Sequence, residues 1–235
     1  VIERQIHMPL NNPGGWFGRL VLRTPFLAFI FAFLTLGSAG AAETVRVHIP
    51  PGESPPKGWT VKEWRGKADI GVVKTQFGNA IHMKSAGTSS AVYKEVSFDL
   101  KEFPHLNWRW MVTKLPKGAD VRRRSADDQA IQVYVVFPRW PEQVNSRLVG
   151  YIWDSSAPEG LTVRSAKSKN TRYVVLKSGA AGVGDWFQEK RNVYEDYRAL
   201  CNEEPPKAGS VTIMIDSDDT KSVAEAFVSD IYFSK

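Results

Sequence analysis

Two adjacent aspartates, Asp127 and Asp128, are separated by only Gln129 from the apolar stretch "AIQVYVVF" at residues 130–137. Asp216 and Asp218 come at the end of a second apolar stretch, "VTIMI", at residues 211–215. If a sheet brings these carboxylates to one rim, they can bind Ca²⁺, a hard cation that takes several oxygen ligands. Asp127, Asp128, Asp216 and Asp218 are therefore candidate metal ligands, and Ca²⁺ is the candidate cofactor.

Two other interpretations of the aspartates remain open. A pair of carboxylates can act as general acid and base in glycoside cleavage, which makes Asp127 and Asp128 catalytic candidates, with Arg191 holding an anionic sugar. Aspartate also closes turns through side-chain to backbone hydrogen bonds, so the same residues can be purely structural. The spacing after Asp216 resembles the start of an EF-hand loop, but Lys221 stands where that loop requires glycine, so the motif fails.

Tryptophan and arginine supply the candidates for ligand binding. In "NWRWMV", Trp108 and Trp110 share one face of a predicted strand and Arg109 lies on the other. Aromatic faces stack on the apolar faces of sugars, while arginine binds hydroxyls or acidic groups. Together with Trp153, and with Arg124 from the basic run "VRRRS", these residues form a predicted glycan-binding set. The alternative is that the tryptophans belong to the core and Arg109 faces solvent.

Short runs of alternating or β-branched residues, separated by Gly, Pro, Ser and Asp, recur along the chain. They predict ten strands: "TVRVHI", "ADIGVVK", "AIHMKS", "AVYKEVSF", "LNWRWMV", "AIQVYVVF", "RLVGYIWD", "RYVVLK", "SVTIMID" and "AFVSDIYF". This spacing is typical of an antiparallel β-sandwich of the jelly-roll, galactose-binding-like kind. One helix is expected in "GDWFQEKRNVYEDYRAL", with Asp185 as its N-cap, packed against the sandwich.

The first 41 residues have the pattern of a secretory signal peptide. Arg19 and Arg23 precede an apolar run at residues 26–36 that is too short to span a bilayer, and Ala39-Gly40-Ala41 follows as a cleavage pattern. We expect cleavage near Ala41, a single domain at residues 42–235, and a periplasmic or secreted protein. Contact with the membrane is expected only through the cleaved peptide.

Charge and cysteine content narrow the class of partner. Removing residues 1–41 takes away three basic residues and one acid, which lowers the net charge from +6 to +4. This mild basic excess fits an anionic polysaccharide, whereas the lack of a basic cluster interleaved with aromatics argues against nucleic acid. Cys201 is the only cysteine, so the expected monomer depends on its core rather than on an internal disulfide.

Several spaced motifs resemble those of a known family. "NWRW", "GAD", "DDQAIQVYVVF", "YIWD", "EDY" and "DSDDT" occur in the order of the bacterial exported family called domain of unknown function 3047, over roughly residues 58–233. The resemblance implies one exported β-rich domain whose biochemistry is unassigned. Its pattern singles out Trp108, Trp110, Asp120, Asp127, Asp128, Phe137, Trp153, Arg191, Asp196, Tyr197, Asp216 and Asp218.

Two positions depart from that family pattern. Ile131 stands where an arginine is expected, which weakens any fixed aspartate–arginine pair there, and Asp219 stands where asparagine is expected, which adds an acid to the rim. The closing "AEAFVSDIYF" also resembles the last strand of jelly-roll carbohydrate-binding modules. That likeness is an analogy of fold.

Three functions follow as hypotheses. The first is an exported protein of the bacterial envelope that binds a glycan through the tryptophans and arginines named above. The second is a polysaccharide hydrolase or lyase that uses the aspartate cluster. The third is a structural envelope protein whose aromatic residues are core and whose acids only form turns.

Overall fold

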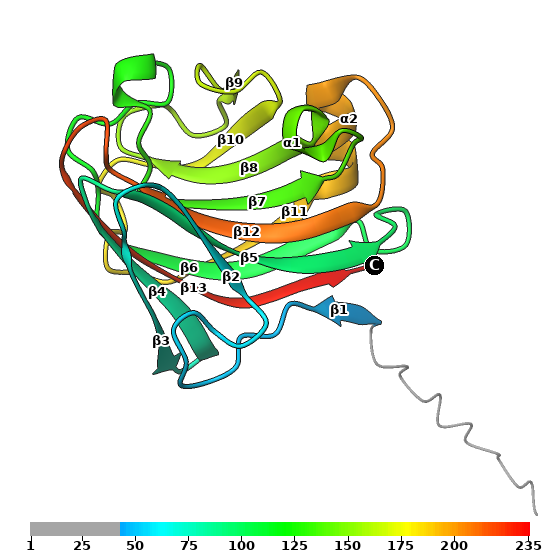
Figure 1. The fold of residues 1–235 in the computed structure, drawn as a ribbon, viewed down its shortest axis with the longest axis horizontal. Coiled ribbons are helices and arrows are strands. Elements are labelled where there is room, and N and C mark those ends of the chain that lie inside the picture. Colours follow the sequence, from blue (N-terminus) through cyan, green and yellow to red (C-terminus); the bar gives the residue numbers. More distant parts are fainter. Residues whose placement is uncertain (1–42) are drawn as a thin grey trace, which may run out of the picture. The chain divides into compact units, whose positions relative to one another are not determined.

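Thirteen strands in two sheets dominate the computed structural model, which describes residues 43–235 (Figure 1). The predicted signal peptide lies outside the described residues. One sheet contains β1 (Thr44–Arg46), β3 (Asp69–Thr75), β4 (Gly78–Ala86), β6 (His105–Lys114), β11 (Phe187–Asn192) and β13 (Val223–Ser234). The other contains β2 (Thr60–Arg65), β5 (Ser89–Phe98), β7 (Ile131–Phe137), β8 (Arg147–Asp154), β9 (Thr162–Arg164), β10 (Thr171–Ser178) and β12 (Ala208–Asp216). The predicted class, a mainly β sandwich, is confirmed.

The six-stranded sheet has the order β11-β6-β13-β4-β3, and β1 pairs with the end of β13. The seven-stranded sheet has the order β2-β5-β12-β7-β8-β10-β9. All strand pairs are antiparallel except β8 with β10, which run parallel. That exception arises because the chain between them crosses over the sheet and adds β9 on the far side of β10. At the other side, β2 and β3 are the edge strands of the two sheets.

The core lies between the sheets and follows the alternation in the sequence. On β7, Ile131, Val133, Val135 and Phe137 face inward and are fully buried. They meet apolar side chains from β6 and β13 of the opposite sheet, which belong to the same cluster. Burying these chains removes apolar surface from water, the largest favourable contribution to folding.

A second apolar cluster lies on the outer face of the seven-stranded sheet. It contains Val121, Tyr134, Ile152, Ala157, Tyr173 and Val175, with Leu161 and Val163 packed against them from the β8–β10 connection. This connection covers β7, β8 and β10, whereas β2 and β5 lie outside the cluster. In Figure 1 the strands of this sheet bow, with their hollow side toward β9.

The predicted helix is shorter than expected and begins later. Residues 187–192 form β11, and α2 (Val193–Cys201) follows, with Asn192 as its N-cap accepting a hydrogen bond from the Glu195 N–H at 3.1 Å. The prediction of Asp185 as N-cap is wrong because residues 187–192 instead pair with β6. Val193 and Tyr197 of α2 are buried, as the predicted apolar face requires.

Two further short helical segments are a 3-10 turn, η1 (Arg124–Ala126), and α1 (Glu142–Asn145). Within residues 43–235, no helix has the length and apolar character needed to cross a membrane.

Gly150 sits where two tyrosine rings meet, because Tyr134 and Tyr173 flank it in register on β7 and β10. A Cβ at Gly150 would lie 2.6 Å from Cε1 of Tyr134 and 3.0 Å from Cδ1 of Tyr173. We therefore expect Gly150→Ala to lower the free energy of unfolding by about 1–3 kcal/mol through overpacking, measured by urea denaturation. Gly71→Ala on β3 is the control, since a Cβ there meets nothing within 4 Å. Equal stability of the two variants would contradict this packing.

Candidate functional site

The acidic residues do gather at one rim. Because β7 and β12 are antiparallel neighbours, the start of β7 lies beside the end of β12, and the Asp216 N–H donates to the Gln129 carbonyl at 3.2 Å. Asp127 and Asp128 precede β7, while Asp218 and Asp219 occupy the turn after β12. We call Asp127, Asp128, Asp216, Asp218 and Asp219 the acidic rim.

Asp128 is the carboxylate that organises this rim. Its Oδ1 accepts a hydrogen bond from the Asp219 N–H at 3.2 Å, and its Oδ2 accepts from the Thr220 N–H at 2.7 Å and the Thr220 hydroxyl at 2.6 Å. The side chain is fully buried. A buried carboxylate that accepts three hydrogen bonds fixes the turn after β12, as the turn-forming interpretation predicted.

Basic residues form ion pairs with two other acids of the rim, Asp218 and Asp219. Lys167, in the β9–β10 loop, forms an ion pair with Asp219 at 2.5 Å, and Arg65 of β2 forms one with Asp218 at 3.1 Å. Carboxylate oxygens of Asp128, Asp218 and Asp219 lie within 4.8 Å of one another. This trio differs from the predicted ligand set, because Asp219 takes the place of Asp127 and Asp216. The Ca²⁺ hypothesis stays a prediction.

Burial changes the protonation of two rim residues. It raises the pKa of Asp127 to about 6, although a hydrogen bond from Gln129 Nε2 at 2.9 Å opposes the shift. Burial, with Asp218 and Asp128 nearby, raises the pKa of Asp216 to about 10. The hydrogen bond from Asp216, together with Lys167 and Arg65, lowers the pKa of Asp218 despite its partial burial. Asp216 therefore holds a proton at neutral pH and shares it with Asp218.

The other predicted catalytic and binding residues lie elsewhere. Arg191 at the end of β11 binds Asp196 of α2 through two hydrogen bonds of 3.0 and 2.6 Å, and the Tyr151 hydroxyl donates to the same carboxylate at 2.7 Å. Within residues 43–235, no hydrogen bond or ion pair connects Arg191 with the acidic rim. Arg124 donates to the Ala166 carbonyl and so ties η1 to the β9–β10 loop.

The structure contradicts the predicted role of the tryptophans. Trp108, Trp110 and Trp153 are fully buried between the sheets, where Trp108 and Trp110 meet edge to face with ring centroids 5.5 Å apart. Their faces are closed to a ligand. Arg109 lies on the opposite, outward side of β6, as expected, with its guanidinium 4.3 Å from the centre of the Phe77 ring. The alternation correctly predicted which residues share a face, but that face is the core.

Two other tryptophans are exposed instead. The exposed fraction is 52% for Trp64 on β2 and 88% for Trp140, which follows β7. The sequence carried a signal for both, since "KEWRG" and "PRWPE" surround each indole with charged or turn residues rather than apolar ones. These two residues were missing from the predicted site.

Trp64 lies on β2, and Trp140 lies in the loop between Pro138 and Glu142, two residues that line a pocket on the outer face of the same sheet. Thr60, Tyr93 and Thr212 lie side by side across β2, β5 and β12, on the face away from the core. Toward Trp140, this face holds a pocket of about 600 Å³. The pocket is lined by Tyr93, Glu95, Val96, Ser97, Val136, Pro138, Glu142, Ser146, Gly209 and Ser210. We call the face from Trp64 to Trp140 the outer groove.

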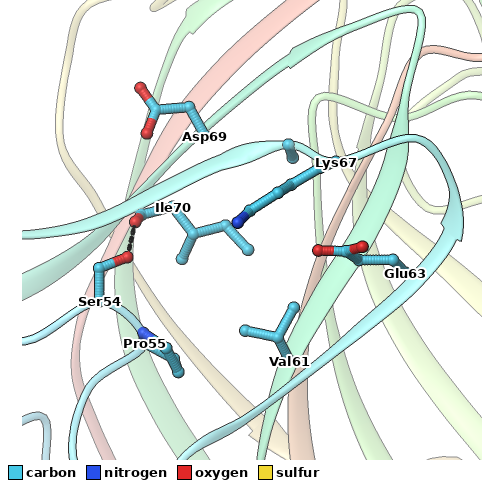
Figure 2. A pocket seen from close by; sticks show the side chains of 8 residues that line it. Ser54, Pro55, Val61, Glu63, Lys67, Asp69 and Ile70 are labelled. Carbon is cyan, nitrogen blue, oxygen red and sulfur yellow. Dashed lines mark hydrogen bonds between the residues drawn. The ribbon is translucent and has the colours of Figure 1, made fainter.

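A separate pocket opens between the two edge strands. It has a volume of about 510 Å³ and is lined by residues of β2, β3 and the segments around them (Figure 2). Glu63 and Lys67 point into it, and the Ser54 hydroxyl donates to the Ile70 carbonyl (Figure 2). Glu63 therefore faces this edge pocket, although Lys62 and Trp64 on either side of it belong to the outer groove.

Comparison with known families identifies the chain. Residues 57–232 match a family described as "Protein of unknown function (DUF3047)". The chain belongs to this family. The resemblance found in the sequence motifs is thereby confirmed, and the family description assigns no activity. None of the curated proteins matches the chain.

Solved structures share the sandwich architecture at low identity. The family 11 carbohydrate-binding module of cellulase Lic26A-Cel5E of Clostridium thermocellum is 9% identical, with a TM-score of 0.45, over 83% of this chain and 95% of that chain. The family 11 xylanase from Neocallimastix patriciarum is 10% identical, with a TM-score of 0.39, over 83% of this chain and all of that chain. Neither likeness indicates what this chain binds or whether it is an enzyme.

The raised pKa of Asp127 predicts a pH dependence of stability. The folded state binds this proton more tightly than the unfolded chain, so the contribution of Asp127 is present below pH 4 and is lost as the pH rises to about 6. Asp127→Asn removes the titration and keeps an oxygen acceptor for Gln129. We expect the stability of the variant relative to wild type to increase by about 2 kcal/mol between pH 4 and pH 7, measured by urea denaturation. Parallel pH profiles of the two proteins would refute the shift.

Proposed function

We propose that this protein is an exported glycan-binding protein of the bacterial envelope that holds a polysaccharide chain in the outer groove. The observation that carries the proposal is the pair of exposed indoles beside a polar sheet face, Trp64 at 52% and Trp140 at 88% exposure. Tryptophan is enriched at interaction surfaces, because its ring is apolar while its N–H can donate a hydrogen bond.

The chemistry of the groove suits a sugar. An indole offers a flat apolar surface for the C–H face of a pyranose ring, and leaving it exposed forgoes the stabilisation that burial would bring. Hydroxyl groups of Thr212, Ser97 and Ser210 lie between the two indoles, with the phenol of Tyr93 and the carboxylate of Glu95. Such groups can exchange hydrogen bonds with sugar hydroxyls.

The length of the groove favours a chain over a single sugar. Trp64 lies near the start of β5 and Trp140 near its end, since Glu63 pairs with Ser90 while Val136 and Ser97 line the pocket next to Trp140. The ten residues of β5 span about 30 Å at roughly 3.4 Å per residue. An oligosaccharide of several residues fits that length.

The proposal also includes the cellular location of the protein and its type of binding partner. The segment at residues 1–41 supports export to the periplasm or beyond, where envelope polysaccharides are found. A monomer is sufficient for this function, because the groove is formed within a single sheet of one chain. Nucleic acid is not proposed as a partner.

Glycan cleavage is the second candidate, and one observation favours it. The proton shared by Asp216 and Asp218 lies next to the Trp64 end of the groove, because Arg65 binds Asp218 at 3.1 Å. A carboxylic acid that stays protonated at neutral pH is the form that a general acid requires. Asp216 is buried, however, and its proton partner is already tied to Arg65. Binding is therefore the first proposal.

The exposed indoles provide the test. We expect Trp64→Ala and Trp140→Ala each to weaken retention of a bound polysaccharide by about tenfold, which corresponds to about 1.4 kcal/mol of lost stacking. Affinity electrophoresis against neutral and acidic bacterial polysaccharides measures the effect. Trp186→Ala, the same change outside the groove, should leave binding unchanged.

Three outcomes separate the functions. Loss of retention in the double variant, with a constant polymer mass in size-exclusion chromatography, supports a binding protein. A polymer mass that falls with time supports cleavage. Wild-type retention by the double variant would remove the outer groove from the proposal.

A further inference from the structure

The two ends of the outer groove differ in charge. Toward Trp140, the pocket contains the carboxylates of Glu95 and Glu142. Arg139 and Arg147 lie nearby but outside the lining, and both form ion pairs with Glu203, at 2.5 and 2.9 Å. The charged groups that line the pocket itself are therefore both acidic.

At the Trp64 end, Lys62 is a cation without an ion-pair partner. Its ammonium lies 4.9 Å from the centre of the Trp64 ring, so both side chains project from the same side of β2. Within residues 43–235, no carboxylate oxygen approaches the Lys62 ammonium within ion-pair distance. A cation held against an exposed aromatic ring by this contact alone remains free to bind an anion.

The charged neighbours of Lys62 along β2 are directed elsewhere. Arg65 binds Asp218 in the acidic rim. Glu63 points into the edge pocket on the other side of β2 (Figure 2). Lys62 is therefore the cation that contacts the Trp64 indole.

We propose that the Trp64 end of the groove is a subsite for a carboxylate-bearing sugar, a uronic acid residue of the chain. This inference rests on the proposed glycan-binding function. The sugar ring stacks on Trp64, and its carboxylate accepts a charge-assisted hydrogen bond from Lys62. Such a bond is stronger than the exposed contact between cation and ring that it replaces. The acidic Trp140 end takes uncharged sugar residues, since its carboxylates repel a second anion.

Matched polymers test the charge preference directly. The probes are polygalacturonate and alginate, each compared with its fully methyl-esterified form, which keeps the sugar ring and removes the charge. We expect wild-type protein to bind at least one acidic polymer about tenfold more tightly than its ester, and to lose that preference as NaCl is raised from 20 to 200 mM. Affinity electrophoresis and titration calorimetry measure both.

Variants assign the preference to Lys62. Lys62→Gln should lower binding of the acidic polymer to the level of the ester while leaving ester binding unchanged. Lys74→Gln, the same change at an exposed position of β3 in the other sheet, should have no effect. When Trp64 is already replaced by alanine, Lys62→Gln should cause little further loss of binding to the acidic polymer, because the two side chains act on one sugar residue.

The possible failures are distinguishable. If wild-type protein binds acid and ester equally, or if Lys62→Gln weakens both to the same extent, the uronic acid subsite is overturned and glycan binding remains. If the protein retains only neutral polysaccharides, the same conclusion follows. If it retains no polysaccharide of any charge, both the subsite and the proposed function fail.

Discussion

The contact of three tryptophans between the two sheets is the constraint on which the rest of the molecule depends. Trp108 and Trp110 project from β6 of one sheet, and Trp153 projects from β8 of the other, with the rings of Trp110 and Trp153 centred 6.2 Å apart. An indole buries roughly 150–250 Å², so each contributes several kcal/mol at about 25 cal/mol per Å². In a chain with one cysteine, these rings take the place of a covalent connection between sheets.

The use of these rings in the core leaves any ligand to the outer surfaces. The outer face of the seven-stranded sheet is divided, because the β8–β10 connection covers part of it and leaves β2 and β5 outside the apolar cluster. Gly150 has no side chain, which leaves room for the rings of Tyr134 and Tyr173 on the covered part of this face.

Alternation in the sequence was sufficient to predict most strands, and the failures have a physical cause. All ten predicted strands are present, whereas three others, β2, β9 and β11, were missed. "TVKEWR" and "FQEKRN" contain few apolar residues, and β9 is only three residues long. All three are edge strands with one neighbour, where polar residues are tolerated on both faces. Pairing with β6 also overrode the helical pattern before Asn192.

The candidate site was only half predictable for a related reason. The ends of strands can be predicted from the sequence. Because β7 and β12 are antiparallel neighbours, the residues before one and after the other gather at one rim, namely Asp127, Asp128, Asp216 and Asp218. The period of two places Trp108 and Trp110 on a common face but does not say which face of a sheet becomes the core. That choice depends on the opposite sheet, which contributes residues distant in sequence.

Hydrogen bonds and an ion pair connect the acidic rim with the outer groove. Asp128 fixes the turn after β12 through three hydrogen bonds, and that turn presents Asp218 to Arg65 of β2. Arg65 follows Trp64 directly, at a bulge where the pairing of β2 with β5 shifts by one residue. The ion pair therefore connects the end of this edge strand, next to the exposed indole, with the turn after β12. The buried Asp128 thus acts on the segment around Trp64 indirectly, through the turn that carries Asp218 and through Arg65.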